Sequence, residues 1–190
     1  MTACDSEVID EMSKEAYSYC RFFCEENILL LYEDLCKESV EDMRDARVLF
    51  ISNPQKCCAF YAQTLGIAPH YQICWDYHVV LYQVHPVPRI WDFDSRLGFC
   101  TQATEYFRKS FFPFGKMSNN NAAYIRSLCA KFYAENFSSN RNLINPKQAE
   151  KIKFPDWPKI FRGELSLERC IDFNDGALAS FVSLETFMQT

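Results

Sequence analysis

The chain lacks long apolar runs, blocks of like charge and glycine-rich segments. No stretch approaches the roughly 20 apolar residues that cross a membrane. Residues 1–12 are acidic and polar, whereas a secretory signal begins with basic residues followed by an apolar run. The net charge is −5 and no basic cluster is present. The sequence therefore predicts binding neither to nucleic acid nor to a membrane.

Only five glycines occur among 190 residues, and 48% of the residues are apolar. These values are typical of one compact globular domain, so we expect a single domain over residues 1–190. The absence of targeting segments favours a cytoplasmic protein that could also enter the nucleus. Ten cysteines occur, none in a Cys-x-x-Cys pair. In a reducing compartment most should be free thiols, and their irregular spacing argues against a structural zinc site.

The residues that are present predict helices around an antiparallel sheet, an α+β domain. Residues 24–37 carry Ile28, Leu31 and Leu35 at helical spacing, which indicates a well-buried helix. Residues 73–84 and 89–97 are rich in β-branched and aromatic side chains, which is typical of two hairpin strands. Other elements are expected as strands over residues 47–52, 123–129 and 179–183 and as helices over residues 101–110 and 130–137.

Cys24 is the best-placed candidate nucleophile. It opens the strongest predicted helix, and a helix N-terminus stabilises a thiolate. Cys36 lies near the opposite end of that helix, where the dipole disfavours an anion. The backbone N–H of Cys24 is also a candidate donor to an oxyanion, because the first N–H groups of a helix lack partners within it.

A thiol nucleophile needs a base, and His78 is the only histidine placed within a predicted strand. His70 and His85 fall in loops. If the hairpin turn is centred on residue 85, Asp92 lies directly opposite His78, with Asp94 as its diagonal neighbour on the same face. Either carboxylate could orient the imidazole.

Each of these residues also has an ordinary structural interpretation. Most intracellular cysteines are inert, so Cys24 could be a packed thiol. A histidine in a strand is more often a hydrogen-bonded structural group than a catalyst, and Trp75 and Trp91 could belong to the core alone. The spacing of one cysteine and one histidine does not decide between these interpretations.

Three segments favour the catalytic interpretation over the structural one. Residues 23–28 (Phe-Cys-Glu-Glu-Asn-Ile), 75–81 (Trp-Asp-Tyr-His-Val-Val-Leu) and 91–94 (Trp-Asp-Phe-Asp) resemble the protein N-terminal glutamine amidohydrolase family. The resemblance continues to residue 187 and leaves residues 1–18 as an N-terminal extension. It implies an α-β-α core similar to papain and transglutaminase, with the nucleophile helix packed on the sheet.

The resemblance also implies a triad of Cys24, His78 and Asp92, since the first aspartate of the 91–94 run carries that role in the family. It implies hydrolysis of the side-chain amide of an N-terminal glutamine in proteins or peptides. The reaction would pass through a thioester, release ammonia and leave N-terminal glutamate, a degradation signal. A monomer without metal or cofactor is expected.

The substrate's cationic α-amine needs an acceptor, for which Glu25, Asp76 and Asp94 are candidates. Two other functions remain open at this point. One is another thiol amidohydrolase or a transglutaminase-like acyl-transfer enzyme, because the same three residues suit several such reactions. The other is a non-catalytic module that binds N-terminal residues.

Overall fold

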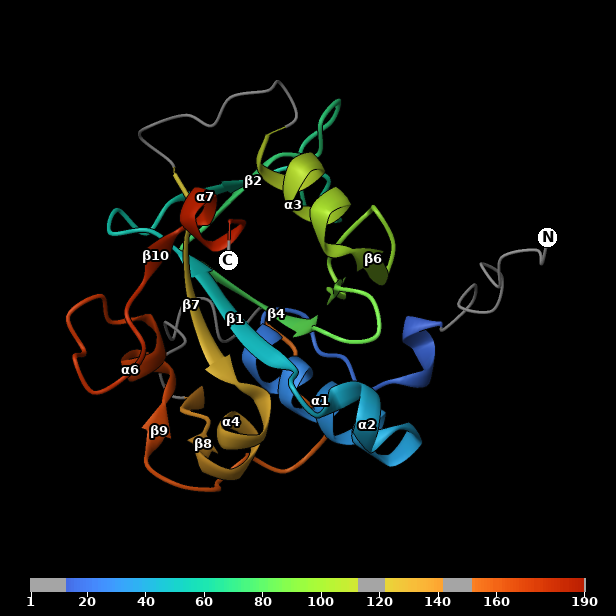
Figure 1. Cartoon of the computed structure of the whole chain (residues 1–190), viewed down its shortest axis with the longest axis vertical. Helices are drawn as coiled ribbons and strands as arrows, with labels where there is room; N and C mark the ends of the chain where they lie inside the picture. Colours follow the sequence, from blue (N-terminus) through green and yellow to red (C-terminus); the bar gives the residue numbers. More distant parts are fainter. Residues whose placement is uncertain (1–12, 113–121, 142–151, 190) are drawn as a thin grey trace.

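The computed structural model describes residues 13–112, 122–141 and 152–189. Its centre is an antiparallel six-stranded sheet with the strand order β10-β7-β1-β4-β5-β6 (Figure 1). The strands are β1 (Arg47–Ser52), β4 (Tyr77–Gln83), β5 (Arg89–Trp91), β6 (Cys100–Gln102), β7 (Tyr124–Cys129) and β10 (Val182–Ser183). Two small sheets pair β2 (Cys58–Phe60) with β3 (Ile73–Trp75) and β8 (Phe137–Ser138) with β9 (Leu165–Ser166). The predicted α+β class is confirmed.

Helices cover both faces of the sheet. They are η1 (Lys14–Ala16), α1 (Cys24–Glu38), α2 (Val40–Met43), α3 (Ala103–Phe111), α4 (Ala130–Asn136), α6 (Leu167–Ile171) and α7 (Leu184–Phe187). In Figure 1, α1, α2 and α4 lie on one side of the sheet and α3 and α7 on the other. Within the described residues, no helix combines the length and the apolar character that crossing a membrane requires.

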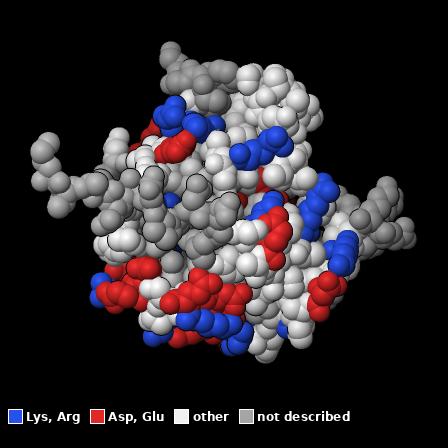
Figure 2. Space-filling model, turned by 90° about the vertical axis from the view of Figure 1, so that its right-hand side faces the viewer, with Lys and Arg blue, Asp and Glu red and all other residues white. Residues whose placement is uncertain are grey.

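The alternation of side chains along β1 explains the two layers. Val48 and Phe50 pack into the core beneath α1, whereas Leu49 and Ile51 pack into the core beneath α3. A strand buried on both faces reads as a continuous apolar run, as β1 does. On the face shown in Figure 2, acidic and basic side chains are interspersed over the surface.

Several predicted elements have their expected places. The strand predicted over residues 47–52 is β1, and the helix predicted over residues 24–37 is α1, one residue longer. The elements predicted over 101–110, 123–129 and 130–137 appear as α3, β7 and α4. The last strand is shorter than predicted, because β10 holds only Val182 and Ser183.

Both strands of the predicted hairpin are shorter than expected. Residues 73–84 divide at Asp76 into β3, which pairs with β2, and β4, which joins the main sheet. Residues 92–97 form turns, in which the Asp94 N–H donates to Asp92 Oδ1 at 2.9 Å. Short polar side chains that accept from nearby backbone favour turns over strands.

The pairing of β4 with β5 differs from the predicted register by two residues. Leu81 lies opposite Trp91, where the predicted register would place Arg89. A shift of two residues keeps each side chain on its expected face. However, β5 ends at Trp91, so Asp92 is not the cross-strand partner of His78 and that prediction was wrong. The side chain of Asp92 nevertheless reaches the imidazole from the turn after β5.

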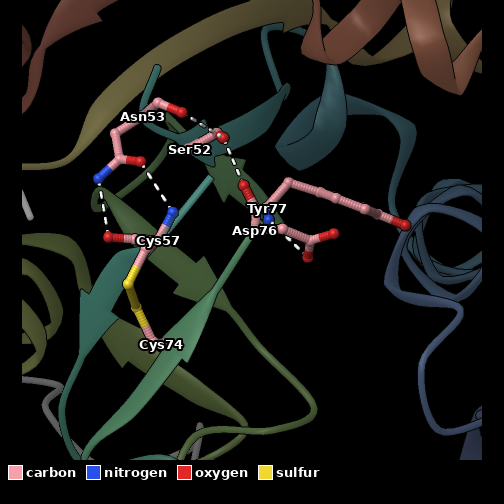
Figure 3. The surroundings of a disulfide bond; sticks show 6 residues. All are labelled: Ser52, Asn53, Cys57, Cys74, Asp76 and Tyr77. Atoms are coloured by element: carbon pink, nitrogen blue, oxygen red, sulfur yellow. Dashed lines mark hydrogen bonds between the residues drawn. A yellow bond between two sulfur atoms is a disulfide. The ribbon is translucent and has the colours of Figure 1, made fainter. Parts of the chain in front are cut away.

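Cys57 and Cys74 form a disulfide between the loop before β2 and strand β3 (Figure 3). This pair is the exception to the expectation that most cysteines are free thiols. The expectation is confirmed for the other described cysteines, which are Cys20, Cys24, Cys36, Cys58, Cys100, Cys129 and Cys170.

Reduction of the Cys57–Cys74 disulfide is expected to lower the free energy of unfolding by about 3 kcal/mol, because the bond closes a loop with a sequence separation of 17 residues in the unfolded chain. Urea unfolding with and without a phosphine reductant would measure this difference. The double variant Cys57→Ser with Cys74→Ser is the control, since the reductant should leave its stability unchanged. Equal stabilities of the oxidised and reduced wild-type protein would contradict the prediction.

Candidate active site

A cavity of about 560 Å³ lies where the start of α1 meets the start of β4. Cys24 and His78 both line it, and so do the three candidate acceptors Glu25, Asp76 and Asp94. The other lining residues are Phe22, Phe23, Trp75, Tyr77, Asn140, Arg141, Ile152, Leu167 and Ile171. The structure thus brings together residues that lie far apart along the chain.

Cys24 is the first residue of α1, as predicted. The preceding turn places Phe22 at a φ of 72°, a left-handed conformation that is uncommon for a residue other than glycine. The side chain of Phe23, the residue before the helix, accepts no hydrogen bond from the first backbone N–H groups of α1. The Sγ atom of Cys24 donates to Glu25 Oε2 at 3.6 Å.

The environment of Cys24 favours the neutral thiol. Burial raises the pKa of Cys24 well above its ordinary value, and the Glu25 carboxylate raises it further. A hydrogen bond from the Val79 backbone acts in the opposite direction. The expected stabilisation of a thiolate by the helix N-terminus is thus outweighed, and proton removal from the sulfur needs a base.

His78 is held from three directions. Its Nε2 atom lies 2.9 Å from Asp92 Oδ1, and the residue is only 2% exposed. The Trp75 ring stacks on the imidazole with centroids 5.7 Å apart, and Phe60 meets it edge-on at 5.4 Å. Burial lowers the pKa of His78, but the Asp92 carboxylate outweighs this effect and the pKa is raised. The other ring nitrogen, Nδ1, makes none of the hydrogen bonds found among the described residues.

Asp92 accepts four hydrogen bonds, which use both carboxylate oxygens. Oδ1 accepts from His78 and from the Asp94 backbone, while Oδ2 accepts from Gln63 Nε2 at 3.2 Å and from the Tyr106 hydroxyl at 2.8 Å. Burial raises the pKa of Asp92, but its interaction with His78 and these donors lower the pKa below the ordinary value. The carboxylate therefore stays ionised and orients the imidazole.

Asp94, the rival carboxylate, faces the cavity instead of His78 Nε2. Its Oδ1 accepts from the Tyr19 hydroxyl at 2.7 Å, and burial raises its pKa. Ligand atoms of His78, Asp92 and Asp94 lie within 4.8 Å of one another, a spacing that suits a metal ion. His78 Nε2 and both Asp92 oxygens are already in hydrogen bonds, so this donor set fits a proton-transfer arrangement better than a metal.

Glu25 is a buried carboxylate beside the sulfur. Its Oε2 also accepts from the Tyr77 hydroxyl at 3.2 Å, and the Tyr133 hydroxyl donates to its backbone carbonyl at 3.1 Å. Burial raises the pKa of Glu25 to about 7. Glu25 therefore changes its charge near neutral pH, next to Cys24.

Replacement of Glu25 by glutamine is expected to speed alkylation of Cys24 by iodoacetamide roughly tenfold near pH 8, because the carboxylate charge that raises the thiol pKa is removed. The difference should fade below about pH 6, where Glu25 of the wild-type protein is itself protonated. Mass spectrometry of the fragment that holds Cys24 measures the rate. Glu38→Gln, an exposed change in the same helix, is the control. Equal rates for Glu25→Gln and the wild type would contradict this account.

Glu26 holds Arg141, which lines the cavity. It is 0% exposed and accepts from Arg141 Nε and Nη2 at 2.9 and 2.6 Å and from Trp157 Nε1 at 2.7 Å. The Phe154 ring also contacts Phe23, next to Cys24. The segment that holds Phe154 and Trp157 therefore packs onto the start of α1.

Sequence reasoning missed the two side chains that complete the environment of Asp92. Tyr106 is fully buried on α3, and a buried tyrosine hydroxyl usually needs a partner, which is a usable signal once the helix is predicted. Gln63 lies in an irregular loop, and nothing in its sequence context indicates a buried polar role. The sequence also did not indicate that the predicted strand divides at Asp76, which places Trp75 and His78 on different strands.

An α+β fold that places a cysteine at a helix start and a histidine–aspartate pair beside one cavity is typical of cysteine-dependent acyl-transfer enzymes. The sequence model of the N-terminal glutamine amidase family matches residues 19–189, and the chain belongs to this family.

Curated relatives agree with this membership. A protein N-terminal glutamine amidohydrolase of Arabidopsis thaliana is 29% identical over 136 residues, which cover 68% of this chain and 62% of the relative. Proteins of the same name from Oryza sativa subsp. indica and Drosophila mojavensis are 24% and 27% identical, over 76% and 75% of this chain and 65% and 71% of their own lengths. The chain thus spans less than two thirds of the two plant proteins.

Proposed function

We propose that this protein hydrolyses the side-chain amide of an N-terminal glutamine in peptides and proteins, with Cys24 as nucleophile, His78 as base and acid, and Asp92 as the orienting carboxylate. One observation carries the proposal. Cys24 and His78 line the same cavity while His78 Nε2 is committed to Asp92, which leaves the other ring nitrogen for the thiol. Membership in the N-terminal glutamine amidase family supports this choice of substrate.

In the first half of the proposed reaction, His78 takes the proton from Cys24 as Sγ bonds to the amide carbon. The imidazolium then gives that proton to the amide nitrogen as the C–N bond breaks. Ammonia departs, and the substrate remains bound to Cys24 as a thioester. In the second half, His78 takes a proton from water as the water oxygen adds to the thioester carbon. The C–S bond breaks, the thiol recovers its proton, and the peptide leaves with glutamate at its N-terminus.

Each tetrahedral intermediate carries an oxyanion that needs donors. The Cys24 backbone N–H is the proposed donor, since no side chain caps the N-terminus of α1. The buried thiol has a raised pKa, so its proton moves to His78 together with attack on the amide carbon. This requires the sulfur to turn from Glu25 toward the imidazole when substrate binds.

The α-ammonium group of the substrate is proposed to bind among Glu25, Asp76 and Asp94, which give the cavity a negative wall. Arg141 also lines the cavity, but its guanidinium is paired with Glu26. An acetylated N-terminus would lack the cation that this wall attracts. The proposed site therefore distinguishes a terminal glutamine from an internal one.

We also propose a relationship to papain- and transglutaminase-like cores. It is supported by a nucleophile helix, α1, packed on one face of an antiparallel sheet, and by a histidine on strand β4 near the start of that helix. Because such cores serve several acyl-transfer reactions, the relationship itself does not choose the substrate.

Ammonia release from three matched peptides that begin with glutamine, asparagine and acetyl-glutamine tests the proposed function. Release is expected from the glutamine peptide alone. Turnover of the acetylated peptide would refute recognition of the terminus and favour another thiol amidohydrolase. Tight binding of the glutamine peptide without ammonia release would instead indicate a non-catalytic binding module.

A further inference from the structure

A second cavity, of about 660 Å³, adjoins the candidate active site. The two cavities share Asp76, Tyr77 and Ile171 in their walls. Because a polypeptide substrate continues beyond its first residue, it has to leave the active-site cavity over one of its rims. An adjoining hollow at that rim is a suitable place for the residues that follow.

The wall between the two cavities is firmly held. Ser52 Oγ donates to the Asp76 carbonyl at 2.5 Å, and Asn53 exchanges two hydrogen bonds with the Cys57 backbone (Figure 3). The Cys57–Cys74 disulfide then joins this loop to the strand that leads to Asp76. The second cavity is thus formed by the folded chain, without a rearrangement to open it.

The charged residues of the second cavity are mostly acidic. Asp76, Glu168 and Asp172 line it together with one base, Lys56. All four residues are exposed, and none of them forms an ion pair within the described part of the chain. The carboxylates that accept hydrogen bonds do so from neutral groups, as Glu168 does from Asn140 at 3.0 Å. Their charge therefore remains available to a cationic ligand.

We propose that this second cavity holds the substrate residues that follow the N-terminal glutamine, and that its carboxylates favour lysine or arginine at those positions. The inference rests on the proposed function. A third hollow, of about 350 Å³, also touches the active-site cavity, at Phe22 and Ile152, but it is smaller. Its charged residues are Arg21 and the ion pair of Lys153 with Asp156, so its net charge is positive. If the substrate peptide left the active site through this third hollow, acidic residues would be preferred after the glutamine. The two routes therefore predict opposite preferences.

The test compares kcat/KM for ammonia release from peptides that begin Gln-Gly-Lys-Lys, Gln-Gly-Ser-Ser and Gln-Gly-Glu-Glu. The lysine peptide is expected to exceed the glutamate peptide roughly tenfold, since two or three exposed charge pairs each contribute modestly. The difference should lie in KM, because these contacts are remote from the reacting bond. It should also shrink in about 1 M salt, which screens exposed charges.

Glu168→Gln and Asp172→Asn, made separately, should each move the lysine-to-glutamate ratio toward one. Glu105→Gln, a change at a half-buried acid on α3 outside this cavity, should leave the ratio unchanged. Equal rates for the three peptides would overturn this inference alone. A preference for the glutamate peptide would also overturn it and would place the substrate peptide on the route past Phe22. No ammonia from any peptide would overturn the proposed function as well.

Discussion

Replacement of Cys24 by alanine is expected to lower ammonia release from a glutamine peptide by at least about 10,000-fold, because among the described residues of the cavity only Cys24 offers a thiol. Cys24→Ser should lose nearly as much, since a hydroxyl is far less readily deprotonated than a thiol at this site. Acid quenching of the wild-type enzyme during turnover should yield an adduct with the mass of enzyme plus peptide minus one ammonia. Mass spectrometry of the quenched protein would detect it.

The matched control is Cys129→Ala, which removes an exposed thiol from β7 and should retain full activity. Thermal unfolding should show that Cys24→Ala remains folded, because the change removes one partly buried sulfur at the cavity wall. A folded Cys24→Ala protein that still released ammonia would exclude Cys24 as the nucleophile.

The positions of Cys24 and His78 are largely predictable from local pattern. The apolar stripe of Ile28, Leu31 and Leu35 defines α1, so its first residue follows from the sequence. The run around His78 has the β-branched content of a strand buried on both faces, as β4 is. Both predictions depend only on residues near in sequence, where periodicity is informative.

The remaining geometry depends on contacts between distant segments. Trp75 stacks on His78 from a different strand, because β3 ends at Trp75 and β4 begins at Tyr77. Between them, Asp76 Oδ1 accepts from the Tyr77 N–H at 2.9 Å. The partners of Asp92 come from the loop after β2 and from α3, so no local pattern indicates them. The raised pKa of Cys24 is likewise a property of burial, which the sequence expresses only indirectly.

Replacement of Asp92 by asparagine is expected to lower kcat by about 10,000-fold while leaving KM for the glutamine peptide little changed. The reason is chemical: an asparagine amide cannot stabilise the imidazolium of His78, and it no longer fixes the ring tautomer. The pH profile provides a second measurement. Burial lowers the pKa of His78 and the Asp92 charge raises it, so loss of that charge should move the acidic limb of kcat/KM to lower pH.

The hydrogen bonds to Asp92 separate this catalytic effect from a loss of stability. Asparagine can accept with only one oxygen, so the pair of donors at one of the two carboxylate oxygens would lose its acceptor. Tyr106→Phe removes one donor and keeps the carboxylate, and it should lower kcat only about threefold to tenfold. If Tyr106→Phe were as inactive as Asp92→Asn while both remained folded, the charge of Asp92 alone would not account for the effect. If Tyr106→Phe instead lowers kcat much less than Asp92→Asn does, the charge of Asp92, acting through His78, is the source of the effect.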